Sequence, residues 1–360
     1  MTTFCYSPRL AGKTEEIVML PPSPNTQMFC TQPFDWCEIH PDGQVFLCCP
    51  AWLKTSVGNL LHAPLDQIWN GERARQVRKA ILEGSFSGCN RQRCPRLASA
   101  TAPVMPLAQV TDPDIRQALQ SGDTTLTYGP RTLNLCHDRS CNLACASCRR
   151  DFHLAQGTAL ETVAVLTEKI RRQAGPSAET LILSGTGDPF GSPTYRDLLQ
   201  NFDAGDFPRL KSIRLHSNGQ LWNKSLWESL TPIHPYVQTA EISIDAATAA
   251  TYTLNRRGGD FRLLLDNLRY IAGLPIALTL SFVVQTNNYR EMPAFVALAH
   301  NLGAAVYFSQ LVNWGTFSRQ EFGERAIHRA DHPDHADFLL VLRSLVDTPR
   351  VDLGNLSSLL

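Results

Sequence analysis

Short runs of apolar residues recur along the second half of the chain, separated by longer stretches with the spacing of amphipathic helices. These helical patterns include LETVAVLTEKIRRQ, LWNKSLWESL and FRLLLDNLRYIAGL. Alternating strands and helices predict βαβ units and a parallel sheet, either doubly wound or curved into a partial barrel. In both architectures ligands gather at the carboxyl ends of the strands. The six predicted strands are residues 132–136, 180–184, 212–217, 240–245, 277–284 and 304–309.

The chain around this repeat divides into further predicted parts. Residues 1–28 contain PPSP and lack periodicity, which indicates a flexible leader. Residues 29–97 predict a small α+β unit, because the turn signal PDG joins two strand-like pieces and a helical pattern ends at Gly84. Residues 98–128 are rich in small residues and proline, as is typical of a linker. The repeat then occupies residues 129–317, and a C-terminal helical extension occupies residues 318–360.

Charge and composition exclude several classes of partner. The 33 basic and 33 acidic side chains give a formal net charge of zero, so bulk electrostatics favour neither nucleic acid nor an acidic membrane. The N-terminus lacks the basic start and apolar core of a signal peptide, and no apolar run reaches the length of a membrane span. We therefore expect a cytoplasmic protein with no nucleic-acid or membrane partner.

Eleven cysteines are many for a protein in a reducing compartment. Nine of them fall into two groups, at residues 30–94 and 141–148, which leaves only Cys5 and Cys136 outside. No cysteine follows Cys148. Clusters of this kind indicate metal binding or catalysis rather than a disulfide framework.

The second group lies in CNLACASCRR, residues 141–150, directly after the first predicted strand. Cys141, Cys145 and Cys148 are one ligand short of the four that close structural zinc sites and ordinary iron–sulfur clusters. A [4Fe–4S] cluster held by three thiolates keeps one iron open for another ligand. The alternative is a zinc site completed by the neighbouring His137.

The pattern C-x3-C-x2-C after the first strand of a repeated βα domain resembles the radical S-adenosylmethionine (radical SAM) family. The resemblance implies a partial (β/α)6 barrel whose [4Fe–4S] cluster binds the amino and carboxylate groups of SAM at the open iron. A reductant such as flavodoxin or ferredoxin supplies an electron, and the cluster passes it to the sulfonium of SAM. The resulting 5′-deoxyadenosyl radical abstracts a hydrogen atom from the substrate.

Three later strand ends carry motifs similar to those that bind SAM in this family. SGTGDP after the second strand resembles the Gly-Gly-Glu loop, with aspartate in place of glutamate. HSNG at the third strand resembles the threonine-asparagine-glycine ending, and SID stands at the fourth. Arg256 or Arg257 could pair with the SAM carboxylate. The resemblance thus implies cofactor contacts from Gly185, Gly187, Asp188, Ser217, Asn218, Ser243, Asp245 and Arg256.

The first cysteine group resembles the SPASM and twitch modules of radical SAM maturases, which hold auxiliary iron–sulfur clusters. Such a module usually follows the barrel, whereas here it precedes the barrel and lacks the long cysteine run of a two-cluster SPASM domain. The resemblance implies one auxiliary [4Fe–4S] cluster, and zinc held by the same cysteines is the alternative. The expected ligands are Cys30, Cys48, Cys89 and Cys94; Cys49 could replace Cys48, and Cys37 could be a ligand, a buried thiol or a hydrogen-atom donor.

Three hypotheses for the role of the chain remain open at this point. The first is a radical SAM enzyme that modifies a peptide or protein side chain, as in the maturation of ribosomally made peptides. In that case the auxiliary cluster lies opposite the SAM cluster across the substrate. The second is a radical SAM dehydrogenase or epimerase that acts on a small molecule such as a sugar or an aminocyclitol. The third is a zinc-binding protein without catalytic activity.

Overall fold

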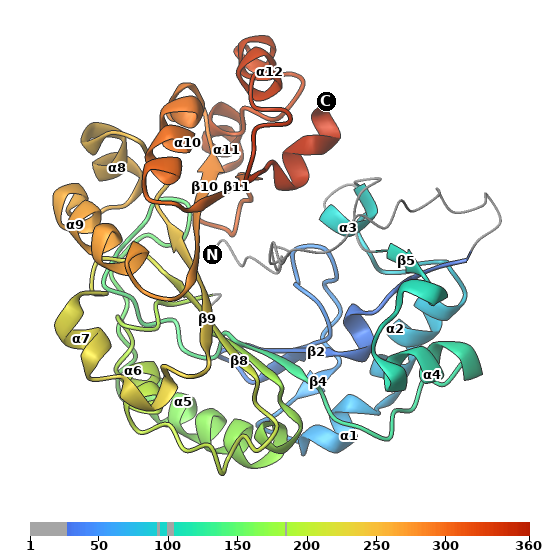
Figure 1. The fold of residues 1–360 in the computed structure, drawn as a ribbon. Coiled ribbons are helices and arrows are strands. Elements are labelled where there is room, and N and C mark those ends of the chain that lie inside the picture. The colour runs from blue at the N-terminus through green and yellow to red at the C-terminus, as the bar shows by residue number, and fades with distance from the viewer. Residues whose placement is uncertain (1–26, 92–93, 99–103, 184–185) are drawn as a thin grey trace.

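A computed structural model of the chain describes residues 27–91, 94–98, 104–183 and 186–360. One ten-stranded sheet curves through the molecule, and a second sheet pairs two short strands (Figure 1). Six strands of the large sheet, β6 to β11, are parallel and adjacent in chain order. They are β6 Thr132–Leu135, β7 Thr180–Leu183, β8 Ser212–Ser217, β9 Val237–Ser243, β10 Ala277–Val284 and β11 Ala305–Gln310.

The six predicted strands are all present, which confirms the α/β class with a parallel sheet. Strands of a parallel sheet are covered on both faces and therefore read as nearly continuous apolar runs. In β10 every residue after Ala277 is buried. The boundaries differ slightly, since β9 starts at Val237 rather than at residue 240.

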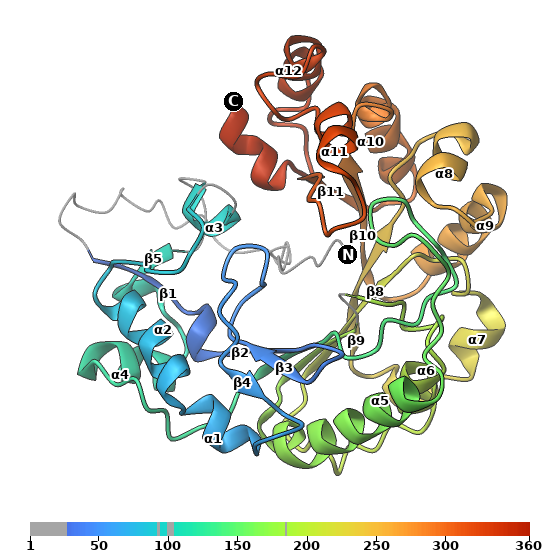
Figure 2. The same cartoon turned by 180° about the vertical axis from the view of Figure 1, so that it is seen from behind.

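Helices cover the outer face of the parallel strands, as two opposite views show (Figure 1, Figure 2). Several begin at a side-chain cap: Ser192, Asn223, Thr248 and Asp260 each accept a hydrogen bond from a backbone N–H of the first helical turn. The helices after β6 are α5 Thr158–Lys169, α6 Pro193–Gln200, α7 Lys224–Glu228, α8 Ala249–Asn255, α9 Phe261–Ala272, α10 Met292–Asn301, α11 Arg319–Arg325 and α12 His335–Arg343.

The N-terminal cysteine unit continues the large sheet instead of standing apart from it. Strand β2 (Trp36–Ile39) lies parallel to β6, with Cys37 opposite Leu133. Strands β3 (Gln44–Phe46) and β4 (Gly58–Asn59) extend the sheet in antiparallel order. Strand β2 thereby supplies hydrogen-bond partners to the edge of β6, whose backbone groups would otherwise be unpaired.

The helical pattern of the N-terminal unit forms two helices, α1 (Leu65–Trp69) and α2 (Glu72–Leu82). Gly71 separates them in an extended conformation and starts α2. The chain leaves α2 through Gly84, which has a φ of +68°. Glycine adopts this left-handed conformation at little cost, so the predicted end of the helix is confirmed.

The stretch that was predicted to be a linker carries secondary structure of its own. Strand β5 (Val104–Pro106) pairs antiparallel with β1 (Met28–Cys30). Helix α4 (Pro113–Ser121) is capped by Asp112 and buries Ile115, Ala118 and Leu119. The proline and small residues of this stretch thus surround a short amphipathic helix that packs on the N-terminal unit. The predicted leader lies almost entirely outside the described residues.

The end of the chain also joins the sheet. Strand β12 (Val351–Asp352) pairs parallel with β11, and the turn η7 (Gly354–Leu359) lies against β11. Turn η7 also contacts α3 (Pro95–Ala98) of the N-terminal unit. The N-terminal unit therefore lies beside both β6 and the C-terminal residues.

Side chains alternate between the two faces of the sheet. Leu133, Leu181, Leu215, Ile242 and Leu280 point toward the helices and belong to the main core. The residues between them point to the concave side, which we call the inner face. The inner face carries Trp36, Glu38, Asn134, Ile182, Arg214, His216, Glu241, Ser243, Ser281, Val283 and Ser309.

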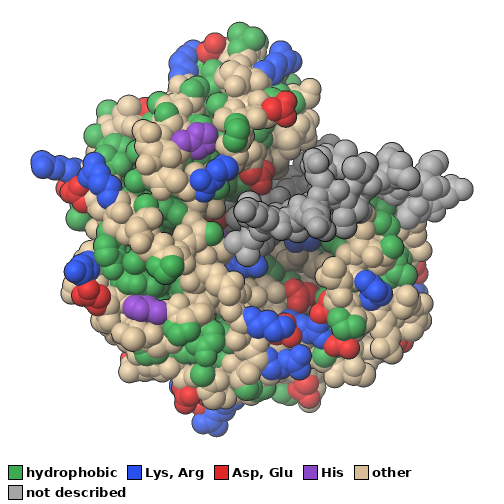
Figure 3. All heavy atoms as spheres, in the orientation of Figure 1, with side chains coloured by type: hydrophobic (Ala, Val, Ile, Leu, Met, Phe, Trp, Pro, Cys, Tyr) green, Lys and Arg blue, Asp and Glu red, His purple; other side chains and the backbone are tan. Residues whose placement is uncertain are grey.

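Charged side chains of both signs are interspersed over the surface shown in Figure 3. This mixture agrees with the formal net charge of zero and gives no support to a polyanionic partner. None of the described helices has both the length and the apolar composition of a membrane span.

Candidate cofactor sites

The cysteine loop that follows β6 is held by hydrogen bonds from its surroundings. Cys141 donates its backbone N–H to the carbonyl of His153 at 2.9 Å. Arg257 donates through Nε to the carbonyl of Ala144 at 2.7 Å and through Nη2 to the carbonyl of Arg150 at 2.7 Å. Arg257, one of the two arginines expected near the SAM carboxylate, therefore fixes the backbone of the cysteine loop.

Each of the three sulfur atoms in this loop accepts a hydrogen bond from a different side chain. Two arginines and an asparagine, drawn from three segments of the chain, supply the donors. The contacts are Asn218 Nδ2 to Cys141 Sγ at 3.7 Å, Arg256 Nη1 to Cys145 Sγ at 3.6 Å and Arg149 Nε to Cys148 Sγ at 3.4 Å. Hydrogen-bond donors and cations stabilise a thiolate, the form in which cysteine binds a metal.

Burial makes two of these thiols, Cys141 and Cys145, hard to ionise on their own. It raises the pKa of Cys141 to about 12, and the nearby carboxylate of Asp188 adds to the rise. Burial also raises the pKa of Cys145, although Arg256 acts in the opposite direction. A bound metal removes this obstacle because its positive charge stabilises several neighbouring thiolates at once. The three cysteines and their donors therefore fit a metal cluster.

Asp188, which was expected to contact the cofactor, uses both carboxylate oxygens within the protein. Oδ1 accepts hydrogen bonds from the backbone N–H groups of Phe190 and Gly191, each at 2.9 Å. Oδ2 accepts from Ser217 Oγ at 2.9 Å and from the backbone N–H of Asn218 at 2.8 Å. The side chain is only 1% exposed. Asp188 thus joins the loop after β7 to the end of β8.

Gly187 lets the loop after β7 pack directly on the chain that leads into the cysteine loop. A Cβ atom at this position would lie 2.6 Å from the carbonyl oxygens of both Asp138 and Ser140. Any side chain would force these backbone segments apart. The close approach expected of Gly187 is therefore an approach to the protein's own backbone. Gly185 lies outside the described residues.

Asp245 and Arg256 form a buried ion pair, with 2.8 Å between Oδ2 and Nη2. The second oxygen, Asp245 Oδ1, accepts the backbone N–H of Val283 at 2.7 Å. Burial by itself lowers the pKa of Arg256, but Asp245 and Cys145 outweigh that effect and raise it, so the guanidinium stays charged. Arg256 Nε is buried and has no hydrogen-bond partner in the part of the chain that the structure describes. Arg256 therefore keeps one donor for a ligand.

Among the expected cofactor residues, Asn218 and Arg256 lie closest to the cysteine sulfurs. Ser217 and Asp188 lie behind Asn218 and hold it in place. Ser243 faces the inner side of the sheet, with its Oγ 3.2 Å from Ser281 Oγ. The expected residues thus divide into two that contact the thiols and others that support them or lie deeper on the inner face.

Sequence reasoning missed a buried polar group behind the cysteine loop. Asp138 Oδ2 accepts a hydrogen bond from Ser192 Oγ at 2.5 Å, and Tyr195 donates its hydroxyl to the carbonyl of Leu135 at 3.0 Å. His137 is enclosed in the same group, and burial lowers its pKa to about 4. Its Nδ1 lies 3.5 Å from the Tyr195 hydroxyl and its Nε2 lies 3.0 Å from Thr167 Oγ1. Both ring nitrogens therefore face protein partners, which disfavours a zinc site completed by His137.

Arg149 was also missed, although it stands directly after Cys148. Besides its contact with the Cys148 sulfur, it donates to the carbonyls of Arg139 and Thr186, each at 2.6 Å. One side chain thus connects the cysteine loop to the loop after β7. The sequence did offer a signal for this role, since two arginines directly follow the last cysteine of CNLACASCRR.

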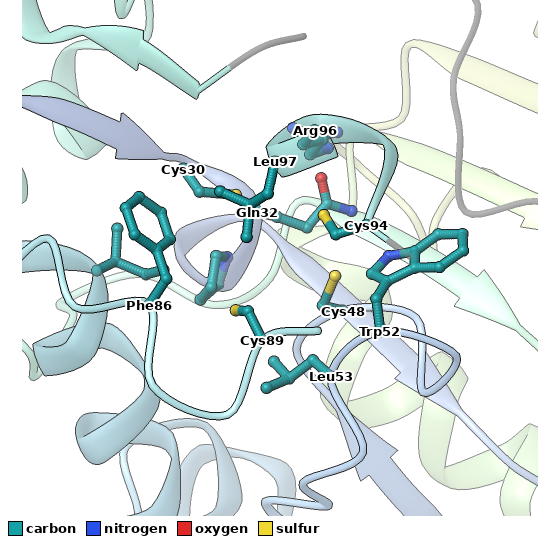
Figure 4. A pocket seen from close by; sticks show the side chains of 12 residues that line it. Cys30, Gln32, Cys48, Trp52, Leu53, Phe86, Cys89, Cys94, Arg96 and Leu97 are labelled. Carbon is teal, nitrogen blue, oxygen red and sulfur yellow. The ribbon is translucent and has the colours of Figure 1, made fainter. Parts of the chain in front are cut away.

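The four cysteines expected to bind the auxiliary cluster lie around one pocket of the N-terminal unit, with their sulfur atoms directed into the same space (Figure 4). Cys30 ends β1, Cys48 follows β3, Cys89 follows α2, and Cys94 precedes α3. Burial raises the pKa of Cys48 well above its usual value, and the neighbouring Cys30 and Cys94 raise it further. The rest of the pocket is largely apolar and includes Trp52, Leu53, Ile81, Phe86, Arg96 and Leu97. Four thiols in an apolar enclosure fit a cluster without an open position.

The two spare cysteines of the first group lie elsewhere. Cys49 packs with Trp36 and Ile182 on the inner face, although it is the neighbour of Cys48 in the sequence. Cys37 is completely buried in the main core, where burial raises its pKa to about 12. The geometry thus favours Cys48 over Cys49 as a ligand and makes Cys37 a buried thiol.

Comparison with protein families identifies the N-terminal unit. Residues 30–95 match the family model of the SPASM iron–sulfur cluster-binding domain. The match spans all four pocket cysteines and confirms the expected SPASM-like iron–sulfur domain. No curated protein matches the chain.

Several solved structures align with the chain at low identity. SuiB from Streptococcus suis bound to S-adenosylmethionine is 15% identical over 66% of this chain and 54% of its own, with a TM-score of 0.43. The chain thus spans about half the length of SuiB. TYW1 with a bound lysine-pyruvate adduct is 15% identical over 62% and 72% of the two chains, with a TM-score of 0.37. The protein anSMEcpe with bound AdoMet and the Cp18Cys peptide is 16% identical over 58% and 56%, with a TM-score of 0.43.

The SPASM match, the C-x3-C-x2-C loop and the parallel sheet support one class of protein: radical SAM proteins with a SPASM iron–sulfur domain. The cysteine loop lies at the carboxyl end of the first parallel strand, where ligands bind in α/β folds. In this chain the SPASM domain precedes the parallel strands and shares their sheet.

Proposed function

We propose that the chain is a radical SAM enzyme in which Cys141, Cys145 and Cys148 bind a [4Fe–4S] cluster with one open iron. The observation that carries the proposal is the set of hydrogen bonds that Asn218, Arg256 and Arg149 donate to the three sulfurs. When bound, the cluster and SAM supply a radical that can remove a hydrogen atom from an unactivated carbon. The residues of the chain bind and orient these groups.

Arg256 is the residue best suited to bind the carboxylate of SAM. It is buried and charged, it contacts Cys145, and its Nε has no partner among the residues that the structure describes. A guanidinium in this position can donate to a carboxylate while its other nitrogens stay bonded to Asp245 and Cys145. Asp245 and Asp188 are positioning residues, because the first orients Arg256 and the second orients Asn218.

The SPASM domain supports an auxiliary cluster held by Cys30, Cys48, Cys89 and Cys94. Its pocket is connected to the inner face through Trp52, which lines the pocket and also packs against the inner-face cluster of Trp36, Cys49 and Ile182. This contact through Trp52 supports a role of the auxiliary cluster as acceptor of an electron from a product radical. Because four protein ligands complete it, this cluster needs no contact with SAM.

We infer that the substrate is a side chain of a peptide or protein. The support is the resemblance of the chain to radical SAM maturases that carry a SPASM domain and modify peptides. The substrate would occupy the inner face, which lies between the SPASM pocket and the strand ends that carry the cysteine loop.

Iron analysis after anaerobic reconstitution tests the two cluster assignments. We expect roughly eight irons per wild-type chain and roughly four in each of two triple variants. One variant replaces Cys141, Cys145 and Cys148 by alanine, and the other replaces Cys48, Cys89 and Cys94. Uptake of zinc without iron or sulfide by the wild-type protein would contradict the proposal.

Deuterium transfer tests the substrate class. The reconstituted protein is incubated with SAM, dithionite and a pool of short peptides made from deuterated amino acids. We expect deuterium in the 5′-deoxyadenosine that is recovered. Label that arrives only from deuterated sugars or aminocyclitols would overturn the peptide assignment and leave the cluster assignments standing.

A further inference from the structure

Glu241 is a buried carboxylate on the inner face that the proposed cofactor contacts do not use. It lies in β9 between Ala240 and Ile242, which both point to the main core, so its own side chain points inward. It is only 5% exposed. In the sheet it stands opposite His216 of β8 and Thr279 of β10.

One oxygen of this carboxylate is unpaired. Glu241 Oε1 is buried and has no hydrogen-bond partner among the described residues, while Oε2 lies 3.8 Å from His216 Nε2. The hydroxyl of Ser281 also interacts with the carboxyl group. No lysine or arginine among the described residues forms an ion pair with Glu241. A buried carboxylate thus lacks both a cation and a full set of donors.

The neighbouring basic groups do not supply the missing charge. Burial lowers the pKa of His216 to about 4, and Arg214 lowers it further, so the imidazole is neutral near pH 7. Arg214 is on the same face, but its favourable partner is Asp35 at the other end of the strands. Burial raises the pKa of Glu241 to about 8, so without a counter-charge the carboxyl group is mostly protonated near pH 7, and a bound cation would ionise it.

Glu38 shows that the inner face can satisfy a carboxylate completely. Its Oε1 lies 2.7 Å from His40 Nε2, and its Oε2 accepts a hydrogen bond from Asn134 Nδ2 at 2.9 Å. Both carboxylates are fully enclosed by strands of the same sheet, yet only Glu241 has an oxygen left over. The difference points to a partner of Glu241 other than the described residues.

Among the other atoms on this face that lack a hydrogen-bond partner in the described part of the chain, Trp36 Nε1 is a donor, whereas Asn134 Oδ1 and Ser309 Oγ can accept a hydrogen bond. Asn134 lies on β6, three strands from Glu241, and Ser309 lies on β11, two strands from it.

We propose that Glu241 binds a positively charged nitrogen of the substrate, an ammonium or a guanidinium, on the inner face of the sheet. This inference rests on the proposed function, because it assigns the inner face to the substrate. The charged nitrogen replaces the missing cation and donates to Oε1, and a charge-assisted hydrogen bond in this enclosed site discriminates strongly against neutral ligands. Glu241 is thus a specificity-determining residue.

Paired probes that differ only in charge test the proposal by isothermal titration calorimetry on the reconstituted protein with SAM. The peptide arm compares Nα-acetyllysine amide with Nα-acetylnorleucine amide. The small-molecule arm compares cyclohexylammonium with cyclohexanol. We expect the cation to bind at least about tenfold more tightly than its neutral partner in one arm, and that arm identifies the source of the charge.

The variant Glu241→Gln keeps the shape of the side chain and removes its charge. We expect it to bind the cationic and neutral probes within about twofold of each other, with the neutral affinity unchanged. Glu38→Gln, the same substitution on the same face, keeps the preference for the cation. No preference in the wild type, or an unchanged preference in Glu241→Gln, would overturn the proposal.

A parallel assay of 5′-deoxyadenosine separates this inference from the proposed function. If SAM is not cleaved but the Glu241-dependent preference for cations is present, the proposed function fails and the binding site stands. If SAM is cleaved and no preference for cations is found, the proposed function stands and the binding site at Glu241 is wrong.

Discussion

Arg256 Nη2 lies 2.8 Å from Asp245 Oδ2, and both side chains are buried beside the Cys145 sulfur. Asp245 is held in an unusual conformation, with a φ of +59°. Its carbonyl accepts hydrogen bonds from Asn255 Nδ2 at 2.9 Å and from Asn288 Nδ2 at 3.1 Å. Strained residues persist where their surroundings over-determine them, commonly at functional sites. The end of β9 therefore presents a fixed carboxylate that orients one arginine toward the cysteine loop.

Replacement of Arg256 by methionine is expected to destabilise the protein by about 3–5 kcal/mol, because it leaves the Asp245 carboxylate buried without its cation. Urea unfolding followed by circular dichroism measures the change. The double variant Asp245→Asn with Arg256→Met should recover most of the loss, since neither charge remains. Arg262→Met, on the exposed side of α9, is the control. Equal losses in Arg256→Met and in the control would contradict the buried ion pair.

Replacement of Asp188 by asparagine removes one acceptor oxygen from a carboxylate that accepts four hydrogen bonds. We expect a loss of about 1–3 kcal/mol in unfolding free energy, because a buried N–H or O–H loses its partner. Asn218 should also move, because its backbone N–H bonds to Asp188, and the cluster held by Cys141 should then be bound less tightly. Iron retention after gel filtration reports this second effect. Asp197→Asn, an exposed site on α6, should change neither quantity, and an equal effect there would rule out the positioning role of Asp188.

Replacement of Gly187 by alanine places a methyl group 2.6 Å from two backbone carbonyl oxygens of the chain that enters the cysteine loop. We expect the thermal midpoint to fall and the bound iron to drop toward the content of a Cys148→Ala variant. Gly323→Ala is the matched control, because the site is helical and no described atom outside the glycine's own helix lies within 4 Å of the added methyl group. Normal iron content in Gly187→Ala would contradict this expectation, because it would mean that the cysteine loop binds its cluster without close packing against the loop after β7.

Cys48 and Cys49 are neighbours in the chain, but only Cys48 lines the pocket of the SPASM domain. We expect Cys48→Ser to lose the iron of the auxiliary cluster and Cys49→Ser to keep it. Iron analysis with electron paramagnetic resonance of the reduced proteins distinguishes the two clusters. The assignment is wrong if Cys49→Ser loses the cluster and Cys48→Ser retains it.

The strands and the cysteine loop were predictable because their signals are local. Runs such as ALTLSFVV are buried along nearly their whole length, so apolar composition alone marks them as strands. The spacing of Cys141, Cys145 and Cys148 is likewise contained in eight residues. The SPASM-like unit was identifiable because its four cysteines lie within one short segment of the chain.

The pairing of β2 with β6 was not predictable in this way. It joins Trp36 to Thr132, which are far apart in the sequence, and nothing in either strand specifies the other as its partner. The same limit applies to Asp188. Its position in SGTGDP suggested a ligand-facing acceptor, but two of the four hydrogen bonds that it accepts come from the end of another strand. The sequence did not mark Glu241 as a functional residue, because a single carboxylate in a strand fits the ordinary alternation of polar and apolar residues.

The formation of 5′-deoxyadenosine tests the central claim most directly. The reconstituted protein is reduced with dithionite in the presence of SAM, and the products are separated by liquid chromatography. We predict 5′-deoxyadenosine and methionine in equal amounts from the wild type and neither from Cys145→Ala, which should still retain the auxiliary cluster. A wild-type protein that binds its full iron but leaves SAM intact, or a Cys145→Ala variant that cleaves SAM at the wild-type rate, would contradict the account.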